Sequence, residues 1–133
     1  MVRSVRATGC EEEVILLLAV ATFLAHHSYT AEFDVNARVM LTGRVTKIEW
    51  TNPHVHIYLD VVDGRGHATW NIEMGSPNGL SGKGWTRKSM NVGDLITVDG
   101  SRAKDGSNAA NARSIVLPSG ARFSAASSQG DTS

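Results

Sequence analysis

The stretch Glu49–Asp60 reads EWTNPHVHIYLD, and the fold of the whole chain can be argued outward from it. Its Asn-Pro step predicts a turn that joins two strands. Side chains alternate between the faces of a strand, so each face collects every second residue after the turn. One face is polar and the other apolar, and in chain order they hold His54, His56, Tyr58 and Asp60 against Val55, Ile57, Leu59 and Val61.

The residues that follow predict a β-hairpin whose register is set by the same alternation. Asp63–Gly66 (DGRG) is a strong turn signal between the strand patterns at 55–62 and 68–74. If these four residues form the loop, Val62 faces His67, and His56 faces Glu73. Every pair on one face is then apolar and every pair on the other is polar, whereas a slip of one residue mixes the two faces.

The strand before the turn, Val39–Trp50, carries a change of face. Val39, Leu41 and Val45 share one parity, whereas Ile48 and Trp50 share the other. A β-bulge or sharp bend makes this change, and Gly43 permits a close approach of another backbone. A bent first strand that serves two sheets is typical of a small closed barrel.

The remaining elements complete an all-β pattern. Ser76-Pro77 is a helix start with a capping hydroxyl, and the glycines that follow keep the helix short. Strands are predicted at Leu95–Lys104 and Ala110–Leu117. The order predicts a five-stranded antiparallel barrel like that of the oligonucleotide/oligosaccharide-binding (OB) fold over residues 39–117, with the helix between strands three and four. A five-stranded sandwich or a split barrel is the alternative.

The composition sets limits on domain number and on partners. A chain of 133 residues allows one modest domain. The contents of 41% hydrophobic and 20% charged residues are typical of a globular protein, and a net charge of zero argues against nucleic-acid binding. The single cysteine, Cys10, excludes an internal disulfide.

The two ends of the chain are predicted to lie outside the barrel. Residues 1–25 have the layout of a cleaved export signal, with an apolar run from Val14 to Ala25 that is too short to anchor in a bilayer. We therefore expect a periplasmic or secreted protein with no stable membrane span, the alternatives being a retained anchor or a buried helix. Residues 26–38 are predicted to be an extended arm anchored by Tyr29 and Phe33. Residues 118–133 are rich in Ser, Gly and Ala, which predicts a flexible tail.

Several short motifs together resemble a known family. They read AHHS at 25–28, EWTNPH at 49–54, GSPN at 75–78 and KDGS at 104–107. With them the chain resembles a family of short exported bacterial proteins that carries only a domain-of-unknown-function label. The resemblance covers roughly residues 25–117 and implies export and a small β fold, but no activity.

Two pairs of histidines indicate a metal site. If the signal is cleaved after Ala25, His26 has a free amine that can chelate a metal together with its own ring, and copper suits such nitrogen-rich sites. If the arm crosses the polar face, neighbouring side chains complete the site or orient a ring. The candidate metal ligands are His26, His27, His54, His56 and Glu73. The alternative is that these histidines are solvent-facing residues without a ligand.

Other functions remain open. The polar face formed by Tyr58, Asp60, Thr69 and Asn71 is a candidate site for an oligosaccharide or small ligand, because OB barrels commonly bind ligands there. The arm or a sheet edge is a candidate interface for a protein partner or for another copy of the chain. The sequence contains no nucleophile with its base and no complete phosphate-loop motif, so we expect a binding protein rather than an enzyme.

Overall fold

The computed structural model describes residues 32–126. The predicted export signal, Tyr29, His26 and His27 therefore lie outside the described residues. Among residues 32–126, no helix has the length and apolar character needed to cross a membrane.

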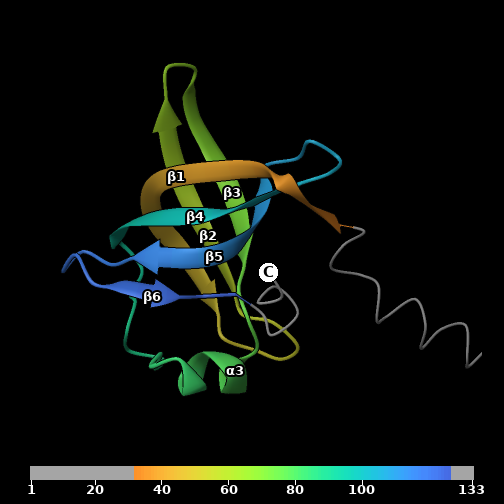
Figure 1. The fold of residues 1–133 in the computed structure, drawn as a ribbon. Helices are drawn as coiled ribbons and strands as arrows, with labels where there is room; N and C mark the ends of the chain where they lie inside the picture. The colour runs from red at the N-terminus through yellow and green to blue at the C-terminus, as the bar shows by residue number, and fades with distance from the viewer. Residues whose placement is uncertain (1–31, 127–133) are drawn as a thin grey trace, which may run out of the picture.

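The described chain is all-β, with six strands and one short helix (Figure 1). The elements, in chain order, are β1 (Phe33–Glu49), β2 (His56–Asp63), β3 (Gly66–Glu73), α3 (Pro77–Gly82), β4 (Leu95–Ala103), β5 (Ala109–Val116) and β6 (Arg122–Ser124). They form one sheet in the order β3-β2-β1-β4-β5-β6, with antiparallel neighbours. A short parallel pairing between β3 and β5 joins the sheet back on itself, so each of β1 to β5 pairs with at least two other strands.

The β2–β3 hairpin has the predicted register. Val62 pairs with His67 and His56 with Glu73. The side chains of Val55, Ile57 and Leu59 are fully buried, whereas the alternate residues between them are partly exposed. The turn is tighter than expected, because Asp63 and Gly66 themselves pair and leave a two-residue connection. In Figure 1 this turn projects from one end of the molecule, and α3 lies at the other end.

The predicted change of face in the first strand is a bulge. The register between β1 and β2 shifts between Val45 and Lys47. Gly43, two residues before the shift, lies so close to β2 that an added Cβ would be 2.6 Å from the carbonyl oxygen of Asp60. The close approach predicted for this glycine is therefore present.

The segment between β3 and β4 closes one end of the core. Ser76 caps α3, and its hydroxyl accepts a hydrogen bond from the Gly79 amide at 3.1 Å. Leu80, Trp85 and Met90 all belong to the buried core cluster, together with apolar residues of β1 to β5. The one buried side chain of the short helix, Leu80, is therefore part of the core.

The structure corrects two predictions, one near each end of residues 32–126. β1 begins at Phe33 rather than at Val39, because Phe33 pairs with Ala103 of β4, so this part of the predicted arm belongs to a strand. The anchoring role of Phe33 fits its burial. The predicted flexible tail is wrong for β6 and the two alanines after it. β6 pairs with β5, and the buried Ala125 exchanges backbone hydrogen bonds with Arg113 and Gly75.

Candidate functional site

One end of the β2–β3 ladder brings a histidine onto a carboxylate. His54 precedes β2, beyond the cis Asn52–Pro53 peptide bond, and Glu73 is the last residue of β3. The ring Nδ1 of His54 lies 3.1 Å from Oε1 of Glu73, with 37% of the histidine side chain and 12% of the glutamate side chain exposed. The glutamate is therefore held in a mostly covered position, in contact with an imidazole.

His56 is a second histidine next to the same glutamate. It is the cross-strand partner of Glu73, and its ring Nδ1 lies 3.0 Å from Oδ1 of Asn71, within hydrogen-bonding distance. His54 and His56 therefore share one face of the strand, as predicted, and both lie close to the Glu73 carboxylate.

The charge of Glu73 is balanced between opposing influences. Burial raises the pKa of Glu73 above its ordinary value, and the two nearby histidines oppose this rise. The Glu32 carboxylate adds to the rise, which places Glu32 in the same electrostatic environment. A bound cation would relieve the repulsion between the two carboxylates, because an opposite charge favours their ionised forms.

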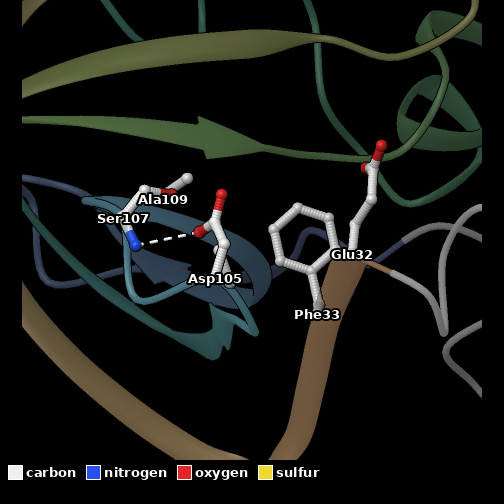
Figure 2. A pocket seen from close by; sticks show the side chains of 6 residues that line it. Glu32, Phe33, Asp105, Ser107 and Ala109 are labelled. Atoms are coloured by element: carbon white, nitrogen blue, oxygen red, sulfur yellow. Dashed lines mark hydrogen bonds between the residues drawn. The ribbon is translucent and has the colours of Figure 1, made fainter.

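Glu32 also borders a cavity of about 300 Å³ at the start of β1. Figure 2 shows the Phe33 ring between the side chains of Glu32 and Asp105, with the Glu32 carboxylate directed away from Asp105. The Glu32 carbonyl accepts a hydrogen bond from the Lys104 amide at 2.8 Å, and the Ser107 amide donates to Asp105 at 2.9 Å. The β4–β5 loop therefore holds the Glu32 backbone at the start of β1, near Glu73.

The metal hypothesis stays a prediction. Within the described range, no group of three or more His, Cys, Asp or Glu side chains is arranged to hold a metal ion. His54 and Glu73 are in contact and His56 is a neighbour, whereas His26 and His27 lie outside residues 32–126. The described part thus supplies a pair of potential ligands.

The predicted ligand face is present but partly satisfied by its own contacts. Tyr58 pairs with Asn71, and Asp60 pairs with Thr69, so the four residues lie on one face. Asn71 hydrogen-bonds to His56, and the ammonium of Lys47 lies 5.2 Å from the centre of the Tyr58 ring. Asp60 is bonded by the His67 ring at 3.1 Å, so the exposed Thr69 is the more available part of the face.

The three tryptophans differ in how far they are available to stack on a ligand. Trp85 is buried, and its indole N–H donates to the Ser124 carbonyl at 2.7 Å, so it serves the core. Trp50 is partly buried against the same core. Trp70 is buried too, with the Arg102 guanidinium 5.0 Å from its ring centre.

Two features of this region have no counterpart in the sequence analysis. Asn111 of β5 is the parallel partner of Glu73 and only 3% exposed, and its side-chain nitrogen has no hydrogen-bond partner among residues 32–126. Glu32 was passed over as part of a polar arm. The pairing of β3 with β5 places Asn111 beside Glu73, and the effect of Glu32 on the pKa of Glu73 places Glu32 near it.

Comparison with known proteins defines a family without assigning a role. No curated protein is significantly similar to this chain. A single-stranded DNA-binding protein from the mitochondria of S. cerevisiae, Rim1, is similar in structure, with a TM-score of 0.46 and 15% sequence identity over 62% of this chain and 94% of that one. A similarity of this size says nothing about what this chain binds. A family model of unknown function, DUF6152, matches residues 14–112, and the chain belongs to that family.

Proposed function

We propose that this protein is an exported binding domain that holds a divalent metal ion, copper foremost, beside Glu73. The observation that carries the proposal is the contact of the His54 ring with the mostly covered Glu73 carboxylate. Imidazole and carboxylate are common ligands of divalent transition metals, and His56 stands next to the pair.

The remaining ligands come from the segment that precedes Glu32. Glu32 lies five positions after His27, so that stretch spans at most about 17 Å when fully extended. Glu32 lies close enough to Glu73 to influence its pKa, so His26 and His27 are within reach of the His54–Glu73 pair. A signal cleaved after Ala25 would add the free amine of His26, and a nitrogen-rich set of this kind favours copper.

The scaffold of this site is an OB-like barrel in our proposal. Its support is the circuit of strand pairings, in which the parallel contact of β3 with β5 joins the two ends of the run from β3 through β2, β1 and β4 to β5. The contact involves Glu73 and Asn111, so the candidate metal site lies on the seam of the barrel.

The proposal is tested with protein that begins at His26, produced with that exact N-terminus. A ligand that binds only the native state raises the melting temperature, by an amount that grows with its concentration over Kd. Cu²⁺ and Zn²⁺ should therefore raise it, and His54→Ala or Glu73→Gln should reduce the rise. His67→Ala is the matched control, because that exposed histidine lies elsewhere on β3 and its ring contacts Asp60 of β2. If both metals leave melting unchanged in the unaltered protein, the proposal fails.

A second candidate function is strand addition by a partner. In the described sheet, β3 pairs with β5 only at residues 71–73, so Gly66–Trp70 pair with β2 alone. An unpaired strand edge is a template for another strand, including one from a second copy. Light scattering across a range of concentrations tests self-association, and a monomer at every concentration removes this candidate in its self-associating form.

A further inference from the structure

A second cavity lies on the outer surface of the sheet, away from the His54–Glu73 pair. It has a volume of about 390 Å³ and crosses three strands, β1, β2 and β4, with one residue from β3. Its lining consists of Thr42, Gly43, Arg44, Asp60, Val62, His67 and Leu95. This size and mixture of apolar and polar groups suits a small organic molecule.

Two large apolar side chains at this cavity are open to solvent. Val62 is 64% exposed and Leu95 is 48% exposed, and both border the cavity. They stand on different strands on either side of β1. An apolar group placed between them would cover both.

Opposite charges stand side by side on the floor of the same cavity. Arg44 and Asp60 are cross-strand partners, yet no hydrogen bond or ion pair joins them in the described part of the chain. Instead, Arg44 donates one hydrogen bond to the Gly93 carbonyl at 3.1 Å, and Asp60 accepts from the His67 ring at 3.1 Å. A guanidinium carries five N–H donors and a carboxylate about four acceptor positions, so each group has capacity left for a ligand.

We infer that this cavity binds a small zwitterion with an apolar side chain, of the chemical class of leucine and related α-amino acids. The carboxylate of such a molecule would meet Arg44 and its ammonium would meet Asp60. The two groups are adjacent in an α-amino acid, as Arg44 and Asp60 are adjacent across the β1–β2 ladder. The side chain would then lie against Val62 and Leu95, and none of these four residues belongs to the proposed metal site.

The experiment is a titration of the metal-free protein, followed by the amide chemical shifts of residues 42–44 and 60–62. L-Leucine should give saturable shifts there, with a Kd on the order of 1 mM or tighter. Leucinamide lacks the carboxylate, 4-methylpentanoate lacks the ammonium, and glycine lacks the apolar group. Each should bind about tenfold more weakly or worse if all three contacts contribute.

Variants assign the contacts to the residues. Arg44→Gln should abolish the preference for leucine over leucinamide, and Asp60→Asn the preference over 4-methylpentanoate. Arg65→Gln, in the exposed hairpin turn, should leave both preferences unchanged. The inference is overturned if leucine gives no saturable shift, or if the three analogues bind as well as leucine does. The analogue series decides the matter even if a variant does not fold.

Discussion

Replacing Gly43 with alanine should force β1 and β2 apart. The new Cβ would lie 2.6 Å from the Asp60 carbonyl oxygen, 3.2 Å from the Asp60 carbonyl carbon and 3.0 Å from Cγ2 of Val61. The nearest of these atoms, the Asp60 carbonyl oxygen, belongs to the backbone, so no side-chain rotation relieves that contact. Gly43 pairs with Val61 on one side and with Ile96 on the other, so the strand has no open side to move toward.

The magnitude follows from two opposing effects. Insertion of a methyl group into a packed position costs about 1–3 kcal/mol, and the close contact with the Asp60 backbone puts Gly43 in the upper part of that range. Alanine recovers roughly 0.5–1 kcal/mol of the entropic cost of glycine in a strand. The expected net loss of stability is about 1–2 kcal/mol, or about 5–15 °C in melting temperature for a domain of this size.

Urea and thermal denaturation followed by circular dichroism measure this loss. Gly64→Ala is the control, because Gly64 also lies on the hairpin but an added Cβ there has no atom within 4 Å. That variant should match the unaltered protein within about 0.5 kcal/mol. Equal melting temperatures for the two variants would refute the close approach of β1 to β2 at Gly43.

Three further predictions concern the pH dependence of stability, at Glu73 and at Asp105, and the C-terminal strand. Burial raises the pKa of Glu73, so the stability contributed by its protonated form is present below the unfolded pKa and is lost as the pH rises through the folded pKa. In metal-free buffer, the melting temperature of Glu73→Gln should therefore rise relative to that of the unaltered protein over this pH window. Hydrogen bonds from Ser107 lower the pKa of Asp105, so Asp105→Asn should show the opposite trend. Its melting temperature should be lower than that of the unaltered protein above the unfolded pKa, and the difference should disappear as the pH falls. Melting temperatures of the two variants that change with pH in the same way would contradict these directions of the two pKa shifts. Trp85→Phe should lose about 2 kcal/mol in urea denaturation, because the Ser124 carbonyl loses its donor and the core loses volume, and a stability equal to that of the unaltered protein would mean that β6 is not held by this bond.

The hairpin was predictable because its information is local. The alternation from His54 to Asp60 and the Asp63–Gly66 turn leave one register in which both faces are consistent, and that register is present. The bulge after Val45 was readable for the same reason, since a change of parity within one strand requires an extra residue.

The C-terminal strand was missed because its stability is not carried by composition. Residues 122–126 have one large apolar side chain, Phe123, in a stretch otherwise made of small or polar residues. β6 forms because β5 offers it an edge and because the Phe123 ring packs against Trp85 at 5.2 Å between ring centres. A pattern based on average hydrophobicity does not detect a strand stabilised by one aromatic contact and by backbone hydrogen bonds.

The candidate site was also predictable only in the part that depends on local sequence. His56 was predicted to face Glu73 because the hairpin register pairs them, whereas the contact of His54, which precedes β2, with the same glutamate comes from the structure. Glu32 and Asn111 come from the start of β1 and from β5, and their proximity to Glu73 depends on how the sheet joins back on itself. Sequence patterns report which residues share a strand face, but not which distant strands meet.

The double pairing of β1 has a consequence for how this sequence can vary. Gly43 and Arg44 each pair with a residue of β2 and with a residue of β4, so they belong to both ladders and link the register of one to the register of the other. An insertion or deletion of a single residue here would shift two ladders in the same step and turn the inward set of side chains outward in both. Length changes among family members should therefore be confined to the connections, such as the β4–β5 loop, while the span of β1 between its two partners keeps a constant number of residues.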